Sequence, residues 1–502
     1  MPPFKGVSRL EHTCLHQLAQ VCSTTCTRLE EWHHEKRPDV SELSGQFSAS
    51  IRLLPTALLE RIIPMVLRAM AVALRRRRAH RGLLKALECL PQKGLRKLDI
   101  GALFADVRLF GPVNTQCKLL LTHAFQALPH LTHLNLVGKC TDDMLREIAR
   151  HCPQLLELNV PVSDITDRGL MALCGESLGS EGTPMNGCRQ LRKLGILNCD
   201  RVTTMGVAGV LRYLNDLTSL VYDKMANAVE LLAKVDLDYI NGSKSLAITH
   251  VDQFSTFFDF DKRPDTISII LRACPHLEAL KFYVSDAGCY QLTAIPNIKH
   301  LQIETENLQS GFSALIAQYS QLLTLELTFR QMNVHHMLQI AETCSQLTVL
   351  KLIGFQVERS EVLVAKKTYF RQLRVLDLRM VKQDDLFEEE EEDDEDTVTP
   401  ALIQFFLNFT LNLEELTLSA VASFFNKAFL MDILSKNHLP QMWKLVISVS
   451  QTEQLDLETA RAVIYQLPKL KVMGLSRWNV QSNEIEKLSR EMKSLNYDLS
   501  FV

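Results

Sequence analysis

The chain has 502 residues, of which 46% are hydrophobic and 23% are charged, and its formal net charge is −3. This composition is sufficient for a continuous apolar core and provides no basic surplus, so we expect no nucleic acid among the partners. No apolar run approaches the roughly 20 residues that span a bilayer, and the first residues show no signal peptide, so we expect no membrane association. Thirteen cysteines without a secretory signal indicate a reducing compartment, cytoplasmic, nuclear or both.

The first predicted element is an amphipathic helix near the N-terminus. Ser8 and Glu11 have the spacing of a capping box at a helix start. Leu10, Cys14 and Leu18 recur every four residues and therefore form one narrow apolar stripe on that helix. A stripe of this kind can dock into the apolar groove of another protein.

A second predicted helix lies in residues 53–64, which contain Leu54, Pro55, Leu58 and Ile62. Proline near a helix start is preorganised for the helical conformation. Leu58 and Ile62 are four residues apart and share a face. The segment therefore predicts another helix with an apolar side available for contact.

Beyond about residue 90, a helical stretch followed by the phrase Leu-x-x-Leu-x-Leu recurs along the chain. Most of its starts are separated by about 21 to 26 residues, the period of leucine-rich repeats. A unit of this length cannot bury its own apolar face, so the units must stack into a solenoid. The clearest examples are Leu131-Leu134-Leu136, Leu155-Leu158-Val160, Leu322-Leu325-Leu327, Leu347-Leu350-Leu352 and Leu373-Leu376-Leu378.

We therefore predict an α/β leucine-rich-repeat horseshoe, with parallel strands on the concave face and helices outside. The predicted organisation is a helical region over 1–90, whose apolar stripes can bind a partner protein, and the solenoid over 91–502. Two insertions interrupt the solenoid. Residues 175–187 are rich in Gly, Ser and Pro and predict a mobile loop. Residues 383–397 include nine consecutive carboxylates, Glu388 to Asp396, which predict a disordered loop that is either simply solvated or attracts a basic substrate segment.

Four cysteines occupy one recurring position, three residues before the first strand leucine. We expect them to be small buried groups that close the preceding helix. Repeats of this form resemble the cysteine-containing leucine-rich repeats of ubiquitin-ligase substrate receptors, including F-box receptors. The cysteines are Cys152, Cys188, Cys274 and Cys344.

The N-terminal elements carry a second resemblance. The spacing of Leu10, Cys14 and Leu18 resembles the BC-box that binds the elongin B/C adaptor, with the departure that Arg9 stands where BC-boxes usually have a small residue or proline. The BC-box-like segment covers residues 8–19. Residues 53–64, which follow it in the chain, resemble a cullin box. The cullin-2 form of this box is favoured because Ala57, and not a second proline, stands two residues after Pro55.

Together these features resemble the zyg-11-like receptors. The resemblance implies a non-catalytic substrate-recognition subunit of a cullin-RING ubiquitin ligase, with elongin B/C, cullin-2 and a protein substrate as partners. Two alternatives stay open. Leu54 and Pro55 also resemble the start of an F-box, which implies the Skp adaptor and cullin-1. Alternatively, both helices only cap a scaffold that has no ligase. No catalytic motif occurs, so we expect no enzymatic activity, no cofactor and no metal.

Two surface features complete the prediction. Arg75 to Arg78 form either a nuclear-import patch or a solvated helix end. Strand alternation predicts that the residues between the repeat leucines form the substrate surface. These candidates are His133, Asn135, Arg192, Lys193, Lys281, Glu326, Lys351, Arg374 and Asp377.

Overall fold

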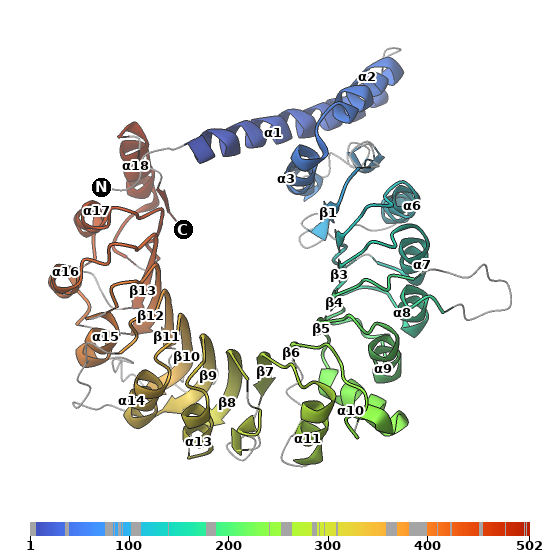
Figure 1. The fold of residues 1–502 in the computed structure, drawn as a ribbon. Helices are drawn as coiled ribbons and strands as arrows, with labels where there is room; N and C mark the ends of the chain where they lie inside the picture. Colours follow the sequence, from blue (N-terminus) through green and yellow to red (C-terminus); the bar gives the residue numbers. More distant parts are fainter. Residues whose placement is uncertain are drawn as a thin grey trace, which may run out of the picture. The chain divides into compact units, whose positions relative to one another are not determined.

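A computed structural model describes most of the chain (Figure 1). The described residues are 7–35, 40–75, 84, 86–88, 92, 94–101, 112–138, 140–176, 187–239, 241–252, 264–283, 289–290, 292–295, 297–307, 310–357, 369–380, 399–408, 410–421, 424–450, 455–476, 478–495, 497 and 499–501. The nine acidic residues Glu388 to Asp396 and the residues Arg76 to Arg78 lie outside this set, as does most of the predicted loop 175–187. Within the described part, no helix is both long and apolar enough to cross a membrane.

The chain divides into two compact units. The N-terminal unit contains residues 9–255 and 268–276, and the C-terminal unit contains residues 1–8, 256–267 and 277–502. Strands follow one another in sequence order within each unit and pair in parallel. The N-terminal unit has β1 (Lys97–Asp99), β2 (His133–Asn135), β3 (Glu157–Asn159), β4 (Lys193–Gly195), β5 (Ser219–Val221) and β6 (His250–Asp252).

The C-terminal unit repeats the pattern with longer strands. They are β7 (Ala279–Tyr283), β8 (His300–Asn307), β9 (Thr324–Met332), β10 (Val349–Val357), β11 (Val375–Met380), β12 (Glu415–Val421), β13 (Lys444–Ser450), β14 (Val472–Gly474) and β15 (Ser500–Phe501). In each unit the strands line one side of the stack and the helices the other (Figure 1). The predicted leucine-rich-repeat solenoid is therefore confirmed in both units.

Helices lie between most of the successive strands of the solenoid, and the first three of the helices given next precede β1. The helices are α1 (Val7–His34), α2 (Val40–Arg52), α3 (Thr56–Arg75), α6 (Pro112–Gln126), α7 (Asp142–His151), α8 (Asp167–Leu173), α9 (Thr204–Tyr213), α10 (Met225–Val235), α11 (Pro264–Ala273), α13 (Ser310–Gln318), α14 (Val334–Thr343), α15 (Pro400–Leu407), α16 (Lys427–Lys436), α17 (Leu457–Gln466) and α18 (Ser482–Ser494), with a 3-10 turn η1 (Leu237–Tyr239).

The repeat leucines form the core because equivalent positions of successive strands are in register. Leu134 of β2 pairs with Leu158 of β3, which pairs with Leu194 of β4. Each of these side chains is at most 3% exposed. A parallel ladder stacks identical apolar positions directly over one another, so every added unit buries the apolar face of the one before it.

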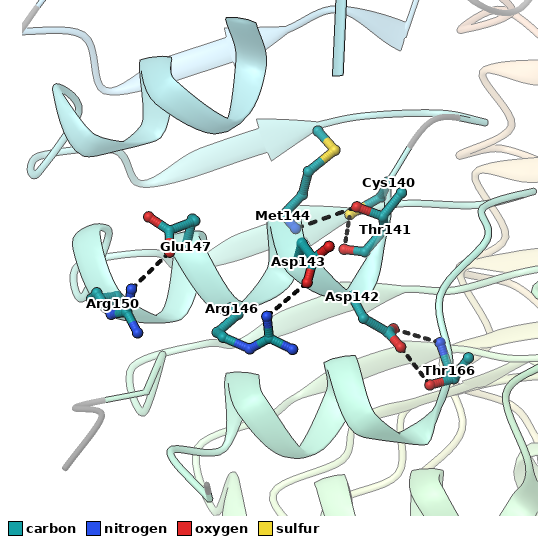
Figure 2. Close-up of polar contacts among 9 residues, drawn as sticks. All are labelled: Cys140, Thr141, Asp142, Asp143, Met144, Arg146, Glu147, Arg150 and Thr166. Carbon is teal, nitrogen blue, oxygen red and sulfur yellow. Dashed lines mark hydrogen bonds and ion pairs between the residues drawn. The ribbon is translucent and has the colours of Figure 1, made fainter. Parts of the chain in front are cut away.

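A second ladder joins the helices of neighbouring repeats (Figure 2). Asp142 in the first turn of α7 accepts hydrogen bonds from the Thr166 backbone N–H at 2.7 Å and from its hydroxyl at 2.6 Å. Asp167 in α8 accepts the same two bonds from Thr203, at 2.8 and 2.6 Å. Because Thr166 and Thr203 are the N-caps of the next helices, each carboxylate ties one helix start to the next.

All four recurring cysteines are buried, as predicted, but Cys188 does not close the preceding helix, because α8 ends at its C-cap Cys174 before the insertion. Cys152 and Cys344 are the C-caps of α7 and α14, and both are at most 1% exposed. The Cys188 thiol lies 3.7 Å from the Cys152 carbonyl oxygen, and the Cys344 thiol lies 3.8 Å from that of Tyr319. Each thiol thus contacts the backbone of the preceding repeat, and all four recurring cysteines are free.

Helix α3 closes the open edge of the first strand. In later repeats, two successive N–H groups donate to one carbonyl oxygen of the preceding strand, as Thr132 and His133 do to Arg96 at 2.7 and 3.0 Å. No strand precedes β1 among the described residues, and Glu60 of α3 supplies the acceptor there. Its Oε1 accepts from the N–H groups of Arg96 at 2.7 Å and Lys97 at 3.1 Å. The carboxylate therefore satisfies donors that would otherwise face an open sheet edge.

Candidate functional site

Helix α1 presents one buried face and one exposed face. Leu15, Ala19, Cys22 and Cys26 recur at helical spacing and are at most 6% exposed. The predicted adaptor-binding residues lie elsewhere on the helix. Cys14 is exposed and Leu18 is half-buried, and Val21, on the same side, is 60% exposed. At about 100° per residue, these three side chains lie within about 60° of arc.

The third predicted contact on this helix is Leu10, which precedes Cys14 by one helical turn. Leu10 lies within the helix, but its side chain is outside the described part of the structure. The described face therefore consists of Cys14, Leu18 and Val21. We call it the α1 face.

The predicted contact residues of the segment 53–64 separate into a surface end and a core end. Pro55 is exposed, Leu54 and Leu58 are half-buried, and the adjacent Leu53 is 85% exposed. The Pro55 carbonyl accepts from the N–H groups of Leu58 and Leu59, so Pro55 stands at the start of α3. Ile62 is 0% exposed. The prediction of Ile62 as a contact residue is corrected, because its side chain packs inside the cap formed by α3.

The strand face of the N-terminal unit is hollowed into a groove of about 520 Å³. Its walls come from Glu60 and Pro64 of α3 and from β1 to β5. The predicted substrate residues His133, Asn135 and Lys193 all line it. Arg192 is exposed and directly precedes Lys193 in the chain. Residues predicted from separate repeats are thus brought together in one groove.

An asparagine ladder crosses this groove. Asp99, Asn135, Asn159 and Gly195 occupy equivalent positions on four successive strands. Asn135 Nδ2 donates to Asp99 Oδ1 at 3.0 Å, and Asn159 Nδ2 donates to Asn135 Oδ1 at 3.2 Å. Asp99 Oδ1 also accepts the N–H of Gly101 at 2.9 Å. The ladder stops at Gly195, which has no side chain to continue it.

Charged residues form a parallel row beside the ladder. Lys193 Nζ lies 2.8 Å from Glu157 Oε1, and His133 Nε2 lies 3.8 Å from Glu157 Oε2. The hydrogen bond from Lys193 and the neighbouring positive charge hold the pKa of the Glu157 carboxyl below its ordinary value. The charge of Glu157 is thereby paired within the protein.

The C-terminal unit brings other predicted residues into register. Lys281, Glu326, Lys351 and Asp377 occupy one column on β7, β9, β10 and β11, with Gln302 of β8 between the first two. Lys351 Nζ lies 2.9 Å from Glu326 Oε2.

Arg374 and Asp377, two of the predicted residues of this unit, are engaged in side-chain pairs. Arg374 Nε donates to Glu414 Oε1 at 2.7 Å, and Arg374 is exposed. Asp377 is 7% exposed, and Arg379 covers it with bonds of 2.9 and 2.7 Å. The prediction of Asp377 as a surface residue is corrected, since Arg379 presents the surface at that point.

The sequence prediction missed several groove residues, namely Glu60, Asp99, Glu157, Asn159 and Gly195. A signal for part of this set exists in the sequence. Asp99, Asn135 and Asn159 each stand between the last two apolar residues of a repeat phrase. A column of the same polar type at one repeat position predicts a ladder, because parallel strands stack equivalent positions. No such signal exists for Glu60.

No protein-family model and no curated protein matches this chain. Solved structures with similarity to it include TLR13 in complex with ssRNA13, with 14% identity and a TM-score of 0.37, covering 75% of this chain and 56% of that chain. The Rad7 and Elc1 complex in yeast has 14% identity, a TM-score of 0.38 and coverage of 99% and 98%. A leucine-rich-repeat protein of Leptospira interrogans has 13% identity, a TM-score of 0.27 and coverage of 84% and 98%. At such identities and scores, the similarity concerns the fold alone.

Proposed function

We propose that this chain is a non-catalytic substrate-recognition subunit of a cullin-RING ubiquitin ligase, acting in the cytoplasm, the nucleus or both. The α1 face binds elongin B/C, the start of α3 contributes to the choice of cullin-2, and the repeats bind a protein substrate. The ligase chemistry belongs to other subunits. The chain has the leucine-rich-repeat fold, which serves macromolecular recognition through an extended strand face.

The observation that supports this proposal most directly is the division of α1 into two faces. Its buried face, with Leu15 and Cys26, belongs to the core of the N-terminal unit. The α1 face contains the cysteine of the BC-box-like spacing, and that cysteine is exposed. A helix that only capped the solenoid would need the buried face alone. An amphipathic helix with a second, exposed apolar side suits insertion into a partner's groove.

A matched pair of substitutions tests the adaptor contact. The full chain is co-expressed with elongin B/C, and complex formation is measured by size-exclusion chromatography. Cys14→Phe places a bulky ring on the α1 face, whereas Gln20→Phe places the same ring on an exposed position about 120° away on the helix. We expect Gln20→Phe to retain elongin B/C and Cys14→Phe to lose at least about ten-fold in affinity, as steric exclusion of a buried anchor requires.

A second readout uses the thiol itself. Cys14 in the isolated chain should be alkylated by iodoacetamide, and bound elongin B/C should protect it, as detected by mass spectrometry of the peptide that contains it. Absence of elongin B/C binding by the unsubstituted chain would refute the proposal, as would binding that survives Cys14→Phe. Capture of the Skp adaptor instead would support the F-box alternative, and capture of neither adaptor would support a scaffold without a ligase.

A further inference from the structure

The asparagine ladder has a fixed direction. A carboxylate only accepts hydrogen bonds, so Asn135 turns its Nδ2 towards Asp99 Oδ1 and its own Oδ1 towards β3. Asn159 must then turn its Nδ2 towards Asn135, as the 3.2 Å bond shows. The Oδ1 of Asn159 is therefore left facing β4, at the end of the ladder. One carboxylate thus determines that the ladder ends in an acceptor.

The ladder ends over a position without a side chain. A Cβ atom at Gly195 would lie 2.1 Å from Asn159 Oδ1, a distance that real atoms do not allow. Glycine at this position is what lets the Asn159 carboxamide lean over β4. Beyond it on β5 stands Val221, at the next equivalent position. In the row, Asn159 is therefore followed by the bare backbone of Gly195 and by the apolar side chain of Val221. Neither residue has a side-chain donor for Asn159 Oδ1.

We propose that a protein segment bound in this groove places a neutral carboxamide side chain, asparagine or glutamine, over Gly195, where it donates an N–H to Asn159 Oδ1. The proposal deepens the substrate-binding half of the proposed function and rests on it. This side chain of the bound segment, called the guest, continues the ladder at Gly195. It donates to Asn159 Oδ1 in the way that Asn159 Nδ2 donates to Asn135 Oδ1.

The surrounding charges select this guest over charged ones. A carboxylate guest has no proton to offer, so its oxygens would oppose Asn159 Oδ1. A cationic guest could donate, but Lys193 lies two residues from Gly195 on the same strand, and the nearby Glu157 is already paired with Lys193 at 2.8 Å. A carboxamide provides the donor without the charge. Its carbonyl oxygen is then free to accept from Lys193 or from solvent.

The test uses a phage-displayed library of random heptapeptides selected on the purified full chain. We expect enrichment of asparagine or glutamine at one position of the selected peptides. A synthetic peptide of the enriched sequence is then measured by fluorescence anisotropy. Replacing its carboxamide residue by aspartate or glutamate should weaken binding at least about ten-fold, because a buried polar mismatch is disfavoured by roughly that factor.

Two variants of the chain make the test specific. Gly195→Ala should displace the Asn159 carboxamide and lose peptide binding, whereas Gly45→Ala, where an added Cβ meets nothing within 4 Å, should not. Asp99→Ala removes the acceptor that orients Asn135 Nδ2, so the ladder is no longer forced into one direction. It should reduce the preference for carboxamide over carboxylate. Thermal melting of each variant shows whether the fold is retained.

The proposal is overturned if no peptide is selected, if selected peptides carry no carboxamide preference, or if the preference survives both Gly195→Ala and Asp99→Ala in folded protein. Elongin B/C capture is measured in parallel on the same variants. Loss of peptide binding with intact elongin capture concerns the groove alone. Peptide selection without any elongin capture leaves the groove site standing and refutes the ligase role.

Discussion

Replacement of Asp142 by alanine should loosen α8 without touching the repeat leucines. The substitution removes both carboxylate oxygens that accept from Thr166, one from its backbone N–H at 2.7 Å and one from its hydroxyl at 2.6 Å (Figure 2). Both side chains are half-buried, so water replaces the carboxylate only in part. A hydrogen bond to a charged group contributes about 1.5–3 kcal/mol. For two partly solvated bonds we expect about 2–4 kcal/mol of local stability to be lost.

The neighbouring aspartate is the matched control. Asp143 also lies in the first turn of α7 and pairs with Arg146 at 2.7 Å, but its side chain is 79% exposed. An exposed pair of this kind contributes at most about 0.5–1 kcal/mol, so Asp143→Ala should have little effect. Asp142→Asn keeps one acceptor and should lie between the two alanine variants. Both alanine variants remove one negative charge from the first turn of α7, so the helix dipole cannot explain a difference in stability between them.

Local opening is the quantity to measure, because a stack of repeats need not unfold as one unit. Hydrogen exchange of the amides in α8, followed by mass spectrometry, reports the free energy of that opening. A double-mutant cycle with Thr166→Val should give a coupling of about 1–2 kcal/mol. Equal exchange in Asp142→Ala and Asp143→Ala, or coupling near zero, would show that the helix-to-helix ladder does not stabilise the stack.

Three further outcomes are expected. Ile62→Ala should lower the free energy of unfolding of the N-terminal unit in urea by about 2–5 kcal/mol, because a fully buried side chain is removed. Leu53→Ala, at a residue that is 85% exposed, should change it by less than about 0.5 kcal/mol, and similar values for both variants would contradict the packing of Ile62 inside the cap. Burial raises the pKa of the Cys152 thiol to about 12, so native protein at pH 8 should be alkylated at Cys14 and not at Cys152, as peptide mass spectrometry would show. The hydrogen bond from Lys193 lowers the pKa of Glu157. The contribution of this pair to stability is therefore present above the ordinary carboxyl pKa and is lost as pH falls through the lowered value. Melting temperatures of Glu157→Gln and unsubstituted protein should differ at pH 6 and converge in acid.

The repeat architecture could be predicted because its signal is local. The spacing of Leu131, Leu134 and Leu136 places three side chains on the inner face of one turn of the solenoid, and the same spacing recurs in each unit. The same holds for Cys152 at a helix end. The amphipathic helix at the N-terminus follows equally from its four-residue apolar period.

Other features depend on contacts that no local pattern contains. Glu60 caps β1 across 36 residues of sequence, and Ile62 is buried because α3 packs against that strand. Asp377 looks like an exposed strand residue by alternation, yet Arg379 folds back over it. Alternation predicts the direction of a side chain and not what covers it.

The chain's own residue pattern determined that it forms leucine-rich repeats and that its first helix has an apolar stripe, since both follow from periods within one element. Only the tertiary structure decided that Asp99, Asn135, Asn159 and Gly195 share one row, and that α1 buries a face other than this stripe and leaves Cys14 exposed. The physical reason is register. Which side chains meet is determined by how strands 24 to 36 residues apart align, and that alignment is the sum of packing over every repeat between them.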